Sequence, residues 1–165
     1  GTVGLRKGIQ YLVQAAILLK DADVEFTIAG SLNITRHAQR EAPDTMKFLG
    51  RVPRDHMSTL YRRADVFVLP TLSDGFALAQ LEAMAHGLPV ITTKRCGRVV
   101  TDREEGLIVE PGSAESLANA LRVCCADRPL LRAMAERARM RASQFSLDQY
   151  SRRLYDALSD HVAGG

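Results

Sequence analysis

The sequence predicts one α/β domain built on a doubly wound parallel sheet, and three observations lead to this fold class. Short apolar runs alternate with amphipathic segments, which indicates βαβ units with right-handed crossovers. The strand-like runs are continuously apolar, as they are when helices cover both faces of a parallel sheet. A length of 165 residues with 46% apolar residues suits a single domain, 1–165, with its own core.

In the first half of the chain, each predicted element has its own signal. Residues 7–20 carry apolar side chains at helical spacing. Residues 24–29 and 46–49 are short apolar strands, and a glycine closes each of them. Pro53 begins the next helix, because proline suits the first helical turn. The run VFVL at 66–69 is apolar throughout and predicts a buried strand.

The second half continues the alternation. A helix over 76–86 is stopped by Gly87. Strands are predicted at 90–93 and 107–109, and Ser113 is the expected N-cap of the helix that follows. Two further helices are predicted, one from Pro129 to about Ser143 and one from Leu147 to about Leu158.

The chain starts with Gly1-Thr2-Val3-Gly4, a sequence typical of the loop before a first helix. We therefore expect that the first strand of the sheet, which is often central, is truncated. The alternative is a domain that never had this strand. An uncovered strand edge would make the isolated chain poorly stable or prone to associate.

The charge balance argues against a nucleic-acid-binding protein. Lys and Arg number 22 against 19 Asp and Glu, and a net charge of +3 is too mild for that function. The arginine-rich stretch 128–153 is interrupted by acidic residues, which indicates solvated helix faces. Weak peripheral attraction of this stretch to an anionic membrane is the alternative that stays open. No apolar run approaches the roughly 18 residues that cross a bilayer.

The cysteine pattern excludes a disulfide framework and a zinc site. The three cysteines are Cys96, Cys124 and Cys125, an odd number with no Cys-x-x-Cys spacing. A reducing cytoplasm is the simplest setting for them. Cys124 and Cys125 fall in a helical pattern and are expected in or near the core.

In open α/β sheets, ligands bind where the carboxyl ends of strands lead into helices, and two such loops suit a phosphorylated ligand. The first, GLRKG at 4–8, places Arg6 and Lys7 between two glycines at a helix start. Positive charge and unpaired N–H groups there favour a phosphate. A stray lysine at a helix start is the alternative.

The second loop, within 70–82, carries Asp74 and, eight residues later, Glu82. A helical rise of about 1.5 Å per residue separates the two carboxylates by roughly 10 Å, the length of a diphosphate with a sugar at either end. The helix N-terminus between them would bind the phosphates, and a carboxylate can accept two hydrogen bonds from a vicinal diol. We expect Glu82 at a ribose and Asp74 at a transferred sugar. An N-cap Asp and a solvated Glu are the alternative.

Six segments in a fixed order carry a family resemblance. They are KGI (7–9), IAG (28–30), FLGRV (48–52), LYRRADVFVLPT (60–71), DGFALAQLEAMAHGLPVI (74–91) and EGLIVEPG (105–112). The series resembles the C-terminal, donor-binding domain of the GT-B glycosyltransferases in retaining family 4, the glycosyl transferases group 1. The resemblance extends from Gly1 to about Tyr155. It implies a Rossmann-like fold, with an acceptor-binding N-terminal domain absent from these residues.

The resemblance also implies roles for individual residues. Glu82 matches the second glutamate of the family's E-x7-E motif and is expected at the ribose. Asp74 falls on the first glutamate, one methylene shorter, and is expected to act on the donor sugar as a catalytic residue together with Lys7, which faces the diphosphate. The residues implied in donor binding are Arg6, Gly50, Arg51, Val52, Gly75, Phe76, Ala77, Leu78 and Glu82.

Three departures from the family pattern concern the expected phosphate site. Ala77 replaces the usual glycine after the phenylalanine. Thr2 occupies the usual arginine position of the first loop, where Arg6 is the candidate to compensate. The segment KRCGR at 94–98 replaces a more glycine-rich loop. Cys96 within it is interpreted as structural, because no histidine partner is evident.

The function implied by the resemblance is transfer of a glycosyl group from a nucleotide-diphospho-sugar to an acceptor, with retention and with neither a metal nor a cofactor. Two alternatives remain: a GT-B nucleotide-sugar epimerase or sugar-phosphate synthase, and a non-catalytic nucleotide-binding or interaction domain. The expected partners are the nucleotide-sugar donor and the N-terminal domain of the same protein, without nucleic acid. The expected setting is the cytoplasm or the inner face of the membrane.

Overall fold

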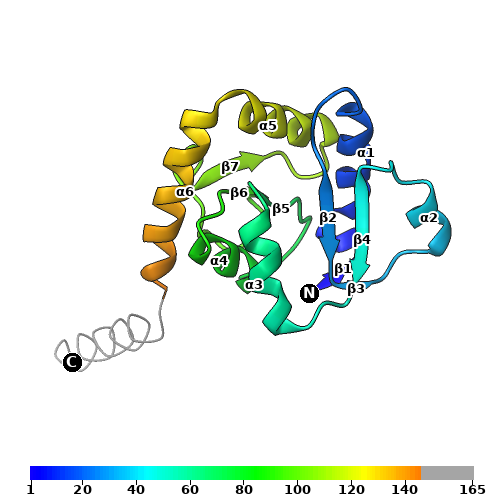
Figure 1. The fold of residues 1–165 in the computed structure, drawn as a ribbon, viewed down its shortest axis with the longest axis horizontal. Helices are drawn as coiled ribbons and strands as arrows, with labels where there is room; N and C mark the ends of the chain where they lie inside the picture. Colours follow the sequence, from blue (N-terminus) through cyan, green and yellow to red (C-terminus); the bar gives the residue numbers. More distant parts are fainter. Residues whose placement is uncertain (146–165) are drawn as a thin grey trace, which may run out of the picture.

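The computed structural model describes residues 1–145, and the structural statements below concern this part of the chain (Figure 1). In chain order the elements are β1 (Thr2–Val3), the 3-10 turn η1 (Leu5–Lys7), α1 (Ile9–Leu18), β2 (Phe26–Ala29), β3 (Ser31–Leu32), α2 (Arg36–Arg40), β4 (Met46–Gly50), α3 (Arg54–Arg63), β5 (Phe67–Leu69), α4 (Leu78–Ala85), β6 (Val90–Thr93), β7 (Gly106–Val109), α5 (Ala114–Ala126) and α6 (Arg128–Ser143). The helix predicted over 147–158 lies outside the described residues.

Every strand pair in this part of the chain is parallel, as the alternation of elements predicts. β5, β6 and β7 form one sheet in that order, while β1 pairs with β3 and β2 pairs with β4. Only Gly30 separates β2 from β3, so one extended segment carries β4 on one side and β1 on the other. The doubly wound α/β prediction is confirmed.

Helices cover both faces of the sheet. In Figure 1, β5, β6 and β7 lie between α5 on one side and α3 and α4 on the other. Neighbouring residues of β6 point into opposite cores: Ile91 packs with Leu117 of α5, whereas Val90 packs with Met84 of α4. This two-sided burial explains why the strand is apolar at successive positions.

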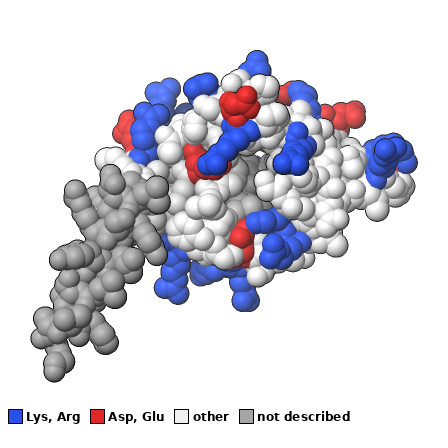
Figure 2. All heavy atoms as spheres, turned by 90° about the horizontal axis from the view of Figure 1, so that it is seen from below, with Lys and Arg blue, Asp and Glu red and all other residues white. Residues whose placement is uncertain are grey.

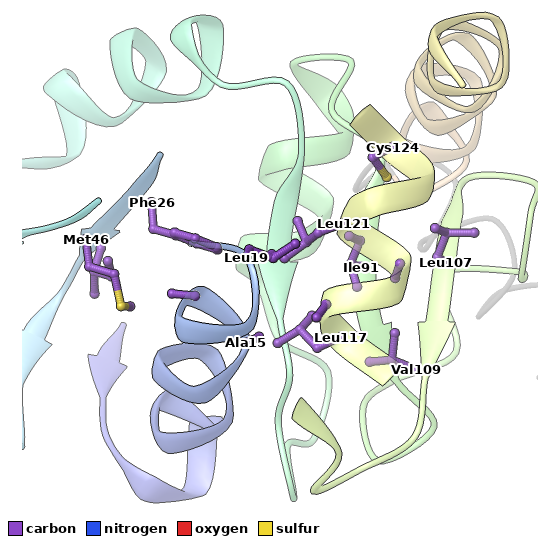
Figure 3. Close-up of a cluster of buried hydrophobic side chains, with 14 of the residues drawn as sticks. Ala15, Leu19, Phe26, Met46, Ile91, Leu107, Val109, Leu117, Leu121 and Cys124 are labelled. Atoms are coloured by element: carbon purple, nitrogen blue, oxygen red, sulfur yellow. The ribbon is translucent and has the colours of Figure 1, made fainter. Parts of the chain in front are cut away.

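The larger core cluster joins the two halves of the sheet. Leu19 at the end of α1 and Leu121 of α5 meet side by side, with Phe26 of β2 and Met46 of β4 to their left (Figure 3). Leu107 of β7 closes the same cluster on the far side. The helices α1 and α5 thus hold β2 and β4 against the β5–β7 sheet.

Polar caps fix where the late helices begin. Ser113 caps α5, because its Oγ accepts a hydrogen bond from the N–H of Ser116 at 3.0 Å, as predicted. Asp127 caps α6 by accepting from the N–H of Leu130 at 2.9 Å, so this helix begins at Arg128, one residue before the prediction.

Three short elements at the start were not predicted. Thr2–Val3 is a two-residue strand, so the assignment of these residues to the loop before the first helix was wrong. It is held by the carbonyl oxygens of Gly1 and Val3, which accept from the N–H groups of Ser31 and Asn33. Like β3 and α2, β1 is too short to give a periodic sequence pattern.

Two helices begin later than predicted. The first helix begins at Ile9, because Gly8 adopts a left-handed conformation (φ 79°) between η1 and α1. α4 begins at Leu78 and not at Phe76, because Ala77 also has a positive φ, 49°. No helix in the described part of the chain is long and apolar enough to cross a membrane.

Candidate functional site

The candidate site lies at the carboxyl edge of the sheet, where η1 follows β1, a loop follows β5 and another follows β4. Figure 2 looks at the molecule from the side on which β2 and β4 end. The surface there is hollowed near its middle, with basic and acidic side chains beside the hollow. In this fold class such an edge is the expected ligand side.

Lys7 and Asp74 form an ion pair across this edge, although 67 residues separate them in sequence. Both side chains are largely shielded from solvent, Asp74 more than Lys7. Burial lowers the pKa of Lys7 below its ordinary value, and the neighbouring Arg6 charge acts in the same direction. The structure therefore brings together the two residues that the resemblance implies in catalysis.

Backbone contacts place Lys7 against the end of β5. The carbonyl of Arg6 accepts hydrogen bonds from the N–H of Leu72 at 2.9 Å and from the Oγ1 of Thr71 at 3.1 Å. Gly8 lies so close to Pro70 that any Cβ there would collide with its carbonyl oxygen. The side chain of Arg6 is exposed, and within residues 1–145 its guanidinium forms no hydrogen bond or ion pair.

The segment before α4 presents open backbone N–H groups. Within residues 1–145, the N–H groups of Gly75, Phe76, Ala77 and Leu78 bond to no backbone carbonyl or side chain. They precede the positive end of a helix, where unpaired donors favour an anion. Asp74 begins this segment, and its own N–H donates to the carbonyl of Arg95 at 2.9 Å.

Gln80 is a residue that the sequence reasoning missed. Its side chain is fully buried, and its Nε2 donates to the carbonyl of Phe76 at 2.8 Å and to that of Gly97 at 3.3 Å. It thereby ties the open segment before α4 to the loop after β6. A buried amide on an otherwise apolar helix face was the signal that could have revealed it.

Glu82 faces α3 instead of Lys7. Its Oε2 accepts from the hydroxyl of Tyr61 at 3.2 Å, and its Oε1 lies 3.7 Å from the guanidinium of Arg54. Arg54 is the first residue of α3, shortly after the carboxyl end of β4. Asp74 and Glu82 thus contact two different segments of the same edge, with the start of α4 between them.

The segment of Gly50, Arg51 and Val52, which the resemblance implies in donor binding, leads directly to the residues that contact Glu82. Gly50 ends β4 with a positive φ of 67°, and Arg51 and Val52 connect it to α3. Arg51 is exposed, whereas Gly50 and Val52 are half-buried. The structure therefore places these three residues on the Glu82 side of the edge.

Beyond Asp74, the loop after β6 borders a surface pocket of about 300 Å³. Lys94 and Arg95 line it together with Glu110. Cys96 in the same loop is buried, and burial raises the pKa of its thiol, which keeps the sulfur protonated. This environment agrees with a structural cysteine and not with a nucleophile.

Several other charged residues have structural contacts. Arg137 of α6 bonds the carbonyl of Glu104 at 2.9 Å, and Arg128 pairs with Asp65 at 3.0 Å. His86 bonds the carbonyl of Glu82 at 2.8 Å and is half-buried, whereas His56 is exposed. Arg128 and Arg137, two of the arginines in the 128–153 stretch, therefore contact other segments of the fold.

An Asp-x-Asp sequence, Asp21-Ala22-Asp23, lies far from this edge in the fold. It precedes the amino end of β2, where both aspartates are exposed. The amino ends of parallel strands share the opposite edge of the sheet from Lys7. These two carboxylates therefore do not contribute to the candidate site. No cluster of three or more metal-ligating side chains occurs within residues 1–145.

Comparison with known proteins identifies the family. A family model described as Glycosyl transferases group 1 matches residues 1–127. The chain belongs to this family. It is 33% identical, over 155 residues, to a D-inositol 3-phosphate glycosyltransferase of Pseudarthrobacter chlorophenolicus, covering 86% of this chain and 37% of that relative. The chain spans less than half the length of the curated D-inositol 3-phosphate glycosyltransferases that it matches.

Solved group 1 structures share the fold. The C-terminal domain of the group 1 glycosyltransferase LpcC from Francisella tularensis aligns with a TM-score of 0.77 at 26% identity, over 88% of this chain and 82% of that domain. Sucrose-phosphate synthase from Thermosynechococcus elongatus aligns with a TM-score of 0.80 at 27% identity, over 99% of this chain and 45% of that protein. The predicted GT-B C-terminal domain is confirmed.

Proposed function

We propose that this chain is the donor-binding domain of a retaining glycosyltransferase that uses a nucleotide-diphospho-sugar. The observation that carries the proposal is the Lys7–Asp74 ion pair beside the open N–H groups that precede α4. A cation, free amides and a carboxylate at one edge match the three parts of a sugar diphosphate: phosphate charge, phosphate oxygens and sugar hydroxyls.

The proposed chemistry rests on stabilising the leaving group. When the glycosyl bond breaks, negative charge grows on the nucleoside diphosphate, and preorganised donors lower the barrier to that step. Lys7 Nζ and the N–H groups of Gly75, Phe76, Ala77 and Leu78 are placed to take this charge without a metal ion. Asp74, released by Lys7, would accept from the donor-sugar hydroxyls.

Glu82 would hold the other end of the donor. Its carboxylate lies beside the β4–α3 connection, where Gly50, Arg51 and Val52 would meet the nucleobase. A carboxylate at this place can accept from both ribose hydroxyls. Acceptor binding would then belong to a second domain of the parent protein, which we propose to act in the cytoplasm, at most with weak contact to the membrane.

The first prediction compares the two carboxylates. Glu82→Ala should weaken binding of UDP, GDP or ADP by about tenfold or more, because a charged partner of the ribose is lost. Asp74→Ala should change it about threefold or less, because these nucleotides lack the donor sugar that Asp74 would contact and the change leaves Lys7 free for phosphate. Isothermal calorimetry or protein-observed NMR titration measures both constants.

A matched control is Glu25→Ala, which removes an exposed carboxylate paired with Lys47 at 2.8 Å on the β2–β4 ladder. This variant should bind like the unmodified chain. Equal losses for the Glu82 and Asp74 variants would refute the division of roles between the two carboxylates.

A second candidate function, a non-catalytic nucleotide-binding domain, is favoured by one observation. Asp74 is one methylene shorter than the family's glutamate and is held by Lys7. If the site is catalytic, the parent protein should hydrolyse its donor slowly in the absence of acceptor, and Asp74→Glu should keep or raise that rate. A parent protein that binds donor but hydrolyses it only as Asp74→Glu would support the non-catalytic alternative.

A further inference from the structure

We propose that Tyr61 is a positioning residue that orients the Glu82 carboxylate toward the ribose of the donor. This inference rests on the proposed function, because it assigns a second residue to the same nucleotide site. Tyr61 would not touch the ligand. It would act through Glu82, and it lies on α3, outside the E-x7-E segment.

The contact between the two residues is direct. The Tyr61 hydroxyl donates to Glu82 Oε2 at 3.2 Å. Only 6% of Tyr61 is exposed, whereas 43% of the Glu82 side chain is exposed. A buried donor therefore holds one oxygen of a carboxylate whose remaining surface faces solvent, where a ligand can reach it.

Packing fixes the ring of Tyr61. It meets Phe67 of β5 edge-on, with ring centroids 6.2 Å apart, and lies against His86 with centroids 5.0 Å apart. Because the ring is held on both sides, the hydroxyl occupies one place relative to the sheet. The direction of the hydrogen bond to Glu82 is thereby set by the core.

The donor stays protonated over the physiological range. Burial, followed by the charge of Glu82 and the hydrogen bond to it, raises the pKa of Tyr61 to about 12. A neutral phenol can only donate to a carboxylate oxygen. Tyr61 therefore offers Glu82 the same hydrogen bond at every pH at which the protein works.

The backbone of Glu82 is held from the same side. His86 bonds the Glu82 carbonyl at 2.8 Å through Nδ1 and Ser58 Oγ at 3.1 Å through Nε2. Ser58 and Tyr61 lie three residues apart on α3, and Glu82 of α4 lies four residues before His86, the C-cap of that helix. Two neighbouring contacts between α3 and α4 thus fix both the main chain and the side chain of Glu82.

The remaining partner of Glu82 is weak. Arg54 lies 3.7 Å from Oε1, and its side chain is 95% exposed, so solvent screens this pair. Without the Tyr61 hydroxyl, the carboxylate could rotate toward Arg54. With the Tyr61 hydroxyl, Oε2 of Glu82 is fixed, and both carboxylate oxygens lose rotational freedom. This favours a ligand that needs two acceptors in one orientation.

The test is Tyr61→Phe in the 165-residue chain. Affinities are measured for UDP, GDP and ADP and for their 2′-deoxy counterparts. The unmodified chain should prefer the ribonucleotide, and Tyr61→Phe should reduce ribonucleotide affinity by about fivefold to tenfold, the effect of one such hydrogen bond. Affinity for the 2′-deoxy form should change little, so the preference for ribose shrinks.

Two further variants separate orientation from general damage. Tyr11→Phe, a conservative change on α1 with no hydrogen bond to Glu82, should leave both affinities unchanged. In a Glu82→Ala background, Tyr61→Phe should have no additional effect on the ribose preference. Phenylalanine keeps the ring contacts, and water can replace the lost donor beside the half-exposed Glu82, so the fold should survive. Urea unfolding checks this.

The outcomes are distinct. An unchanged ribose preference in Tyr61→Phe, or equal losses for the ribo and 2′-deoxy forms, would overturn the orienting role of Tyr61. Failure of the unmodified chain to bind any of the three nucleoside diphosphates would instead overturn the proposed function. A loss of ribose preference caused by Tyr61→Phe in the unmodified chain, but not in the Glu82→Ala background, would support both the orienting role of Tyr61 and the proposed function.

Discussion

Ala77 is the residue whose backbone conformation is least expected from its side chain. It has φ 49° and ψ 70°, a left-handed conformation that costs an L-residue roughly 1–2 kcal/mol. Glycine adopts this conformation without strain, which explains why the family usually has a glycine at this position. The strained residue lies directly before α4, in the segment with open N–H groups.

Ala77→Gly should therefore stabilise the protein by about 1 kcal/mol, the relief of strain less the entropy that glycine adds to the unfolded chain. Urea unfolding followed by circular dichroism measures this change. Arg103→Gly, at the other described non-glycine residue with a positive φ, 63°, serves as a control outside the site. Both variants should gain stability, and a loss in Ala77→Gly would contradict the left-handed conformation.

At the level of residues, sequence patterns lead to the charged members of the site. Lys7 and Asp74 were predicted because charged residues in the loops that follow strands belong at the carboxyl edge of the sheet. Glu82 was predicted from its spacing to Asp74 and from the family resemblance. Gln80 and Tyr61 could not be predicted in the same way. Both lie on apolar helix faces, where the pattern reports burial but not the hydrogen-bond partner.

At the level of elements, α3 and α4 show that apolar periodicity predicts the existence of a helix better than it predicts where the helix begins. Their existence and order follow from the apolar spacing, and Pro53 gives the start of α3 correctly. The start of α4 was predicted two residues early, at Phe76. The positive φ of Ala77 prevents the helix from beginning before Leu78, and a non-glycine residue gives no local signal of that conformation.

The later start of α4 changes the spacing estimate between the carboxylates. Only the stretch from Leu78 to Glu82 is helical, which contributes about 6 Å of rise along the axis. Asp74 and the three residues after it follow a loop path instead. The direction in which Glu82 points is set by α3, an element that the estimate did not include.

At the level of the whole molecule, the two halves of the sheet meet beside Lys7. The first half contains β1, β2, β3 and β4, and the second contains β5, β6 and β7. At the carboxyl edge, the turn η1 and Gly8 lie against Pro70 and Leu72 after β5. The candidate site therefore lies over the junction between the halves.

Gly8→Ala tests how far the fold depends on this junction. An added Cβ would collide with the Pro70 carbonyl, and the φ of 79° would also be strained, so unfolding free energy should fall by about 3 kcal/mol or more. Gly50→Ala has a similar φ, 67°, but nothing within 4 Å of the added Cβ. It should cost about 1–2 kcal/mol.

Chemical denaturation of both variants gives the comparison. Similar losses in the two proteins would mean that the close approach of Gly8 to Pro70 does not hold the halves together. A much larger loss in Gly8→Ala would place the junction among the most sensitive points of the fold.

The overall architecture could be predicted from the sequence because the parallel sheet is buried on both faces. β6 is fully buried, and Val90 and Ile91 pack into opposite cores, whereas β5 is half-buried between the same cores. Such strands need apolar residues at successive positions, and these runs are visible without coordinates. The paired strands β1 and β3 carry two residues each and are held by backbone hydrogen bonds. Because these hydrogen bonds join backbone atoms, no side-chain pattern indicates them, and this part of the sheet could not be predicted from the sequence.

The ion pair between residues 7 and 74 sets a condition on any anion that enters here. Lys7 has three N–H donors, so a phosphate can bind it while Asp74 stays in place, but the two anions then repel each other and the energy gained is reduced by that repulsion. A molecule with an anionic group and hydroxyls a few bonds apart would offer Asp74 hydrogen bonds that offset this repulsion, so we expect this edge to favour phosphorylated sugars over simple inorganic salts.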